Sequence, residues 1–178
     1  MSKAAVFLDR DGTMIEDVGY LNRVEDIVLY PWTVDAIRAL NRAGLPIVVV
    51  TNQSGIARGL FSTRTLFDIH DGLQRAAVQA GGRIDAFFFC PHKADDACQC
   101  RKPQPGMLLE VARRFNIALG DTYMVGDALR DVQAAAAAGA RPVLVLTGKG
   151  LKTQAEGKLP PGTQVFPDLA AFAEHLAP

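Results

Sequence analysis

Three features are scarce in this sequence: cysteine, long apolar runs and an excess of charge of one sign. The 3 cysteines among 178 residues are too few for a disulfide framework. The longest apolar runs, such as residues 47–50 and 86–90, are far shorter than the ~20 residues of a membrane-spanning helix. Lysine and arginine together number 19, as do aspartate and glutamate, which leaves no basic excess to bind nucleic acids or anionic membranes. We therefore expect neither as a partner.

The composition is that of an ordinary globular protein, with 49% hydrophobic and 21% charged residues. A chain of this length buries roughly 70% of its unfolded surface, so it can form a large core without stabilising cross-links. The N-terminal apolar run meets Asp9 before it reaches the length of a signal-peptide core. We expect one domain over residues 1–178, in a cytoplasmic monomer.

Short apolar runs alternate along the chain with stretches of helical periodicity. Val34, Ile37 and Leu40, for example, recur at helical spacing between Pro31 and Gly44. Strands separated by helices form right-handed βαβ units, whose parallel sheet is covered on both faces. The pattern predicts an α/β fold, a three-layer sandwich with a mostly parallel, Rossmann-like sheet. Strands are expected at residues 4–8, 45–50, 84–90, 122–125, 142–146 and 164–166, and helices at residues 33–40, 63–80, 106–115, 129–138 and 169–176.

Polar residues follow four of the expected strands. Parallel strands bring their carboxyl ends to one edge of the sheet, where ligands bind. Carboxylates that meet there repel one another unless a cation lies between them, and an all-oxygen ligand set suits Mg²⁺. A threonine, a lysine and the backbone amides of residues 52–54 could bind a phosphoryl group. The sequence therefore predicts a metal-phosphate site, formed by Asp9, Asp11, Thr51, Lys102, Asp127 and Asp131.

The same residues form a recognisable series of motifs. Residues 9–13, Asp-Arg-Asp-Gly-Thr after an apolar strand, resemble the first signature of the haloacid dehalogenase-like phosphatases. Thr51 resembles the second motif of that family and Lys102 the third. Residues 126–127, Gly-Asp, together with Asp131 resemble the fourth. The intervals between these motifs are too short for a separate cap domain, so we expect a relatively open site.

The resemblance implies a role for each of the first acidic residues. Asp9 would be the nucleophile that forms an aspartyl-phosphate, and Asp11 the general acid and base. Asp9, the backbone carbonyl of Asp11 and Asp127 would hold Mg²⁺, which lets two anions approach. If Asp11 acts as an acid near neutral pH, burial or the substrate phosphate must raise its pKa above the usual ~3.9.

The other motif residues would bind the phosphoryl group or support the residues that do. By resemblance, Thr51, Asn52 and Lys102 would bind the phosphate and the transition state. Asp131 would position Lys102 or a metal-bound water, or simply cap the alanine-rich helix that follows.

The cysteines gather in one loop. Cys90 and His92, followed by Cys98 and Cys100, provide three thiolates and an imidazole, a set that closes a tetrahedral zinc site. With four protein ligands, such a zinc ion would be structural. The alternative is a buried cysteine beside an exposed histidine and two incidental thiols. We expect a zinc-binding loop at residues 90–100 that positions Lys102.

This loop leads into Arg-Lys-Pro-Gln-Pro-Gly-Met at residues 101–107, and the combination resembles the D-glycero-D-manno-heptose 1,7-bisphosphate 7-phosphatases of the histidinol-phosphatase-like subfamily. The resemblance implies removal of the 7-phosphate of this small sugar bisphosphate in nucleotide-heptose biosynthesis, towards lipopolysaccharide core. Arg101 would bind the second phosphate through its bidentate fork. The substrate-recognition residues implied are Asp17, Gly19, Tyr20, Gln53, Ser54 and Arg101.

The sequence departs from this pattern in two places. Ala128 stands where such members often carry a lysine, so any substrate contact of that lysine is absent. The segment between His92 and Cys98 is short, which changes the reach of the loop without removing a ligand. Lys149, in Thr-Gly-Lys-Gly, suggests phosphate binding but lacks the full P-loop pattern, and we assign it no role.

Three alternative functions are considered. An L-histidinol-phosphate phosphatase would share the catalytic motifs and a similar metal loop. A receiver-like signalling domain would also carry a phosphorylated aspartate, but the second aspartate of the Asp-x-Asp pair favours hydrolysis of the acyl phosphate over its persistence. A nucleic-acid-binding zinc module is disfavoured by the neutral charge and the lack of a basic, aromatic strip.

Overall fold

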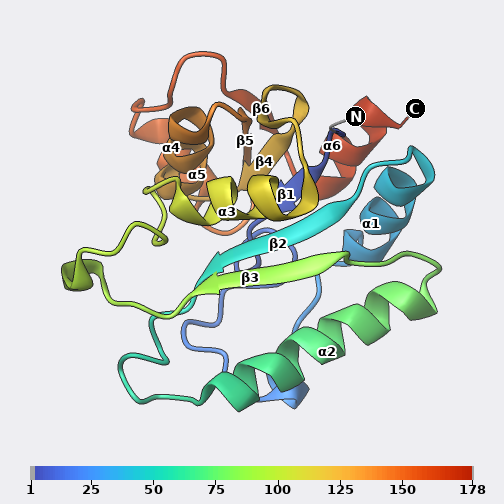
Figure 1. Cartoon of the computed structure of the whole chain (residues 1–178). Coiled ribbons are helices and arrows are strands. Elements are labelled where there is room, and N and C mark those ends of the chain that lie inside the picture. The colour runs from blue at the N-terminus through green and yellow to red at the C-terminus, as the bar shows by residue number, and fades with distance from the viewer. Residues whose placement is uncertain (1–2, 178) are drawn as a thin grey trace.

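The computed structural model describes residues 3–177 and is built on a six-stranded parallel sheet with the order β3-β2-β1-β4-β5-β6 (Figure 1). Every neighbouring pair of these strands is parallel. This arrangement confirms the predicted α/β class and its Rossmann-like sheet. The strands are β1 (Val6–Leu8), β2 (Ile47–Asn52), β3 (Ala86–Cys90), β4 (Tyr123–Gly126), β5 (Arg141–Val145) and β6 (Gln164–Phe166).

Helices connect the strands and cover both faces of the sheet. Helix α5, over Gly150–Ala155, was not predicted, because the segment has no apolar periodicity. Its one large apolar residue, Leu151, is 66% exposed in the structure. Among residues 3–177, no helix is long and apolar enough to cross a membrane. The other helices are α1 (Thr33–Arg42), α2 (Thr63–Gln79), α3 (Gly106–Phe115), α4 (Leu129–Ala138) and α6 (Leu169–Leu176).

The sheet separates two apolar clusters and thereby forms the middle of three layers. Val6 and Leu8 of β1 pack on the face covered by α1, α2 and α6. Phe7, between them, points to the opposite face, where α3 and α4 pack. All three side chains are fully buried, because side chains of a strand alternate between faces and both faces are covered. Figure 1 shows α2 and α3 on opposite sides of β2 and β3.

Strand register brings the carboxyl ends of β1, β2 and β4 to the same edge of the sheet. Leu8 of β1 is paired with Val49 of β2 and with Val125 of β4. The strand order reverses between β1 and β4, and such a switch point opens a crevice at the carboxyl edge of a parallel sheet. β2 runs two residues beyond the predicted end, so Thr51 lies within the strand rather than after it. The residues that follow β1 and β4 therefore meet at this edge.

Candidate active site

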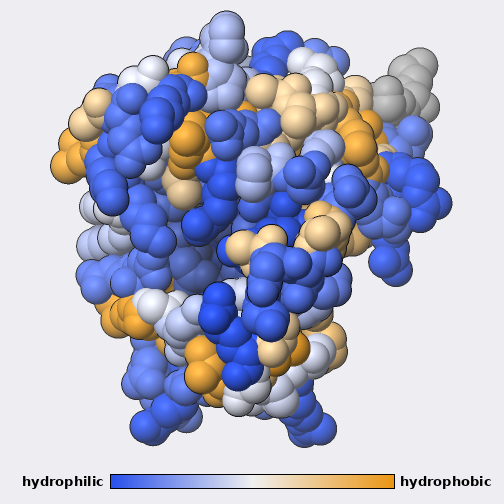
Figure 2. Space-filling model, turned by 90° about the vertical axis from the view of Figure 1, so that its left-hand side faces the viewer, coloured by the Kyte–Doolittle hydropathy of each residue, from blue (hydrophilic) through white to orange (hydrophobic). Residues whose placement is uncertain are grey.

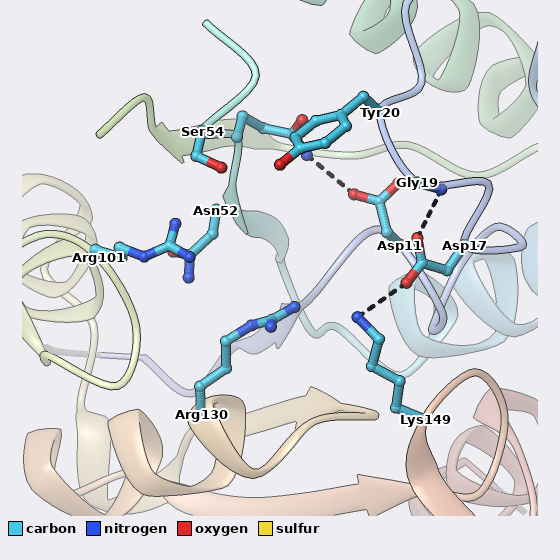
Figure 3. A pocket seen from close by; sticks show the side chains of 10 residues that line it. Asp11, Asp17, Gly19, Tyr20, Asn52, Ser54, Arg101, Arg130 and Lys149 are labelled. Carbon is cyan, nitrogen blue, oxygen red and sulfur yellow. Dashed lines mark hydrogen bonds and ion pairs between the residues drawn. The ribbon is translucent and has the colours of Figure 1, made fainter. Parts of the chain in front are cut away.

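A pocket of about 300 Å³ lies at the carboxyl edge of the sheet. Figure 2 views the molecule from the side on which the β2 and β3 arrows of Figure 1 end, and shows a hollow in a mainly hydrophilic surface. All six substrate-recognition residues expected from the sequence line the pocket, but so do residues to which no role was assigned. The lining is Asp11, Asp17, Gly19, Tyr20, Asn52, Gln53, Ser54, Arg101, Arg130 and Lys149 (Figure 3).

Lys102 is not part of this lining and is buried among carboxylates. Its Nζ lies 2.9 Å from Asp9 Oδ1 and 2.7 Å from Asp131 Oδ1, and donates a 2.7 Å hydrogen bond to the carbonyl of Val50. Burial opposes a charged lysine, but Asp131 and Asp9 outweigh it and raise the pKa of Lys102. The lysine is therefore held as a cation. Together with Asp127 these residues form what we call the inner cluster: Asp9, Lys102, Asp127 and Asp131.

The backbone of Lys102 is fixed by the side chain of Asn52. The amide of Asn52 donates to the carbonyl of Lys102 at 3.0 Å and accepts from its N–H at 3.1 Å. This paired contact ties the loop after β3 to the end of β2. The side-chain amide of Asn52, predicted to bind phosphate, is thus occupied by Lys102.

Asp131 connects the inner cluster to the start of α4. Its Oδ2 accepts a 3.0 Å hydrogen bond from the N–H of Ala128, which satisfies one of the free donors of the helix. Gly126 lies against the same carboxylate, and a Cβ at that position would overlap with it. Two of the roles considered for Asp131, capping the helix and contacting Lys102, are therefore both compatible with its contacts.

The inner cluster has more negative than positive groups. Within residues 3–177, Asp9 Oδ2 and Asp127 Oδ1 are buried and have no hydrogen-bond partner. Burial and repulsion from Asp9 and Asp131 raise the pKa of Asp127 to about 7. Gly12, with φ +81°, allows the backbone to approach the carboxylate of Asp127 closely. Carboxylate oxygens that are buried, unpaired and mutually repelling are a set of ligands that fits Mg²⁺.

Asp11 points into the pocket and is held by two neighbours. The guanidinium of the fully buried Arg10 contacts both of its carboxylate oxygens at 3.0 Å. Gln53 donates to Asp11 Oδ2 at 3.0 Å and to Thr51 Oγ1 at 2.9 Å. Burial and the nearby Asp9 raise the pKa of Asp11, although Arg10 and Gln53 oppose them. This direction is the one that a general acid requires.

The four expected zinc ligands lie together in the loop after β3. Cys90 Sγ is 3.1 Å from Cys100 Sγ and 3.6 Å from Cys98 Sγ, and His92 Nδ1 is 3.3 Å from Cys100 Sγ. One ligand atom from each residue lies within 4.8 Å of the others. Burial raises the pKa of Cys90 to about 12; at Cys98 burial is outweighed by hydrogen bonds, chiefly from the Arg101 backbone, which lower the pKa to about 7. Three thiolates and one imidazole brought together in this way fit zinc.

Sequence reasoning missed three basic residues of the site. Arg10 lies inside the Asp-x-Asp signature, and its position beside Asp11 could have suggested the ion pair. Arg130 stands next to Asp131 in the first turn of α4 and points into the pocket (Figure 3). For Lys149, the sequence suggests phosphate binding but assigns no role. Its Nζ lies 3.2 Å from Asp17 Oδ2, and its N–H donates to Asp127.

The geometry and the comparisons agree on the class of protein. The strand order and the Asp-x-Asp, lysine and Gly-Asp positions around one edge are those of a haloacid dehalogenase-like hydrolase, and residues 99–172 match the HAD-hydrolase-like family model. A D-glycero-beta-D-manno-heptose-1,7-bisphosphate 7-phosphatase from Bordetella bronchiseptica is 51% identical and aligned over 96% of both chains. The same enzyme from Pseudomonas putida is 45% identical over 96% of this chain and 98% of its own. The chain belongs to the D-glycero-beta-D-manno-heptose-1,7-bisphosphate 7-phosphatase family.

Solved structures give the same result. The D,D-heptose 1.7-bisphosphate phosphatase of B. bronchiseptica, complexed with magnesium and phosphate, matches with a TM-score of 0.94 and 50% identity over 97% of both chains. The corresponding enzyme from Burkholderia thailandensis matches with a TM-score of 0.78 and 48% identity, again over 97% of both. The phosphatase class predicted from the sequence is confirmed, and the histidinol-phosphate and receiver-like alternatives are not favoured.

We predict that Lys102→Met destabilises the protein by roughly 3–5 kcal/mol, the usual cost of removing one partner from a buried ion pair. The substitution leaves Asp9 and Asp131 buried without their cation. Chemical denaturation at pH 7.5 measures the free energy of unfolding, with Lys158→Met on the exposed surface as the matched control. Equal stability of the two variants would show that Lys102 does not stabilise the carboxylates.

Proposed function

We propose that this chain is a Mg²⁺-dependent phosphatase that removes the 7-phosphate of D-glycero-D-manno-heptose 1,7-bisphosphate in nucleotide-heptose biosynthesis. The observation that carries the proposal is the inner cluster, in which Asp9 and Asp127 keep unpaired buried oxygens near Lys102. The names of its relatives, 51% and 45% identical, support the choice of substrate.

Asp9 is the nucleophile in this mechanism. Its Oδ1 is held by Lys102, which leaves Oδ2 to attack phosphorus. The new bond joins Asp9 to phosphorus, the bond between phosphorus and the sugar oxygen breaks, and Asp11 gives its proton to the leaving alcohol. Asp11 then takes a proton from water, which attacks the aspartyl-phosphate and releases inorganic phosphate and free Asp9.

Mg²⁺ would be held by Asp9, Asp127 and the backbone carbonyl of Asp11. When bound, it offsets the repulsion between the carboxylate and the phosphate dianion. Thr51 and Lys102 bind the transferred phosphoryl group, and Asn52 supports that contact by fixing the backbone of Lys102.

The outer part of the pocket recognises the sugar. Asp17, Gly19 and Tyr20 approach from the loop after β1, and Ser54 and Arg101 from the loops after β2 and β3 (Figure 3). Gln53 joins this recognition to catalysis, because its amide also holds the catalytic aspartate. Arg101 donates to the carbonyl of His92 at 3.3 Å, and its other N–H groups would bind the second phosphate.

We predict that Mg²⁺ binding weakens below neutral pH. A proton on Asp127, whose pKa is raised to about 7, competes with the ion, so the dissociation constant should rise about tenfold per pH unit below 7 and level off above it. Calorimetric titration with MgCl₂ from pH 5.5 to 8.5 measures this slope. Asp127→Asn should abolish binding, whereas the exposed Asp121→Asn should keep the slope. An affinity that is constant from pH 5.5 to 7 would contradict the assignment.

We predict release of one phosphate per D-glycero-D-manno-heptose 1,7-bisphosphate, dependent on Mg²⁺. Asp9→Asn should lower kcat by at least ~10³-fold, as expected for loss of a nucleophile. Asp71→Asn, which neutralises an exposed carboxylate on α2, is the matched control. Preference for L-histidinol phosphate would contradict the assigned substrate and support the alternative one. Full activity of Asp9→Asn would show that Asp9 is not the nucleophile.

The Cys90, His92, Cys98 and Cys100 cluster binds one structural zinc ion in this proposal. Its support is the convergence of four ligand atoms in a polar loop that has little apolar burial of its own. The ion would fix the loop that ends in Arg101 and Lys102.

We predict one zinc per chain by elemental analysis of protein purified without added metal, and loss of the ion in Cys98→Ser. Because metal binding adds to folding stability, a chelator should lower the Tm of the wild type but not of the variant. A wild type without zinc, or a Tm that is insensitive to chelation, would refute the assignment.

A further inference from the structure

Arg130 lines the pocket with a guanidinium that forms no direct ion pair with the residues that the structure describes, 3–177. Within residues 3–177 its Nε is buried without a hydrogen-bond partner, and no dashed contact reaches its guanidinium in Figure 3. The carboxylates of Asp131 and Asp9 lie near enough to raise its pKa against the effect of burial, yet none of them forms an ion pair with it. A partly buried guanidinium without an acceptor lacks the hydrogen bonds that buried charges require.

The position of Arg130 on its helix does not by itself favour a positive charge. It lies in the first turn of α4 (Leu129–Ala138), where the helix dipole disfavours a positive charge. Attraction to the carboxylates of the inner cluster and of Asp17 outweighs burial, but none of them forms a direct ion pair with the guanidinium. Because the side chain lines the pocket, an anionic ligand there can accept its hydrogen bonds.

The other basic residues of the pocket differ in how far they are neutralised. Lys149 is paired with Asp17 across the pocket, at 3.2 Å. Arg101 donates one hydrogen bond to the carbonyl of His92, and its other N–H groups can bind an anion. In Figure 3, Arg101 and Arg130 come from different elements and point into the same space. Two like charges directed at one space indicate a site for an anion.

This outer pair is separate from the cation that serves the reaction. Lys102 belongs to the inner cluster, where it contacts Asp9, Asp131 and the carbonyl of Val50 and would bind the phosphoryl group that is transferred. The site thus offers an inner position for the transferred phosphoryl group and an outer position for a second anion.

We propose that Arg130 is a specificity-determining residue that binds, together with Arg101, the phosphate that the enzyme does not hydrolyse. The inference rests on the proposed phosphatase function, and it assigns to α4 a recognition role that the sequence analysis gave to the loop arginine alone. Ala128, two residues earlier, has no charge to supply, so Arg130 provides the basic group of this segment.

The test compares substrates with and without a second phosphate. The ratio of kcat/KM for D-glycero-D-manno-heptose 1,7-bisphosphate to that for the 7-phosphate is measured, and likewise for glucose 1,6-bisphosphate and glucose 6-phosphate. Arg130→Gln should lower both ratios by about 10- to 100-fold, the usual effect of one charge-assisted hydrogen bond pair. Arg130→Lys should restore part of the ratio, because it keeps the charge but not the fork.

Arg113→Gln is the charge-matched control, since Arg113 is 75% exposed on α3 and lies outside the pocket. The Tm of each variant is measured alongside, so that a lower ratio is not caused by partial unfolding. Ratios that are the same in wild type and Arg130→Gln would overturn the role of Arg130. If the heptose bisphosphate is not hydrolysed but the glucose ratio still depends on Arg130, only the proposed substrate fails.

Discussion

The ammonium group of Lys102, buried between Asp9 and Asp131, is the contact on which the site depends. It joins the end of β1 to the start of α4 and donates to the backbone of β2, so three segments distant in sequence meet at one atom. Buried ions are costly unless each is paired and hydrogen-bonded, and breaking one pair leaves the others uncompensated. The positions of these segments are therefore coupled, and the carboxylates are held in place before any ligand binds.

The charge distribution of the pocket complements a metal-bound sugar bisphosphate. The inner cluster has three carboxylates and one lysine, which leaves it short of positive charge. The outer part of the pocket has an excess of positive charge. Arg101 and Arg130 point into one space, and Asp17 is already paired with Lys149. A cation at the inner position and an anion at the outer one would neutralise both. Such preorganisation costs stability in the free protein and supports binding and catalysis.

Most of the fold could be predicted because its determinants are local and repetitive. Each strand was marked by a short apolar run and each long helix by apolar periodicity, and the alternation of the two implied a parallel sheet. Helix α5 was missed because it has a single large apolar residue, which is exposed, and is held instead by the buried Gly150 and Thr153. Strand β2 extends to Asn52 because pairing with β3 continues past its apolar residues.

The sequence by itself determined the residue types of the site, because the chemistry of phosphoryl transfer and metal binding requires particular groups at strand ends and in the cysteine loop. Only the tertiary structure decided how they are paired. Arg10 contacts Asp11, Asn52 holds the backbone of Lys102, and Asp17 neutralises Lys149. These contacts depend on strand register and on the direction of each side chain. For that reason the sequence did not show Arg130 as a pocket cation that forms no ion pair within residues 3–177.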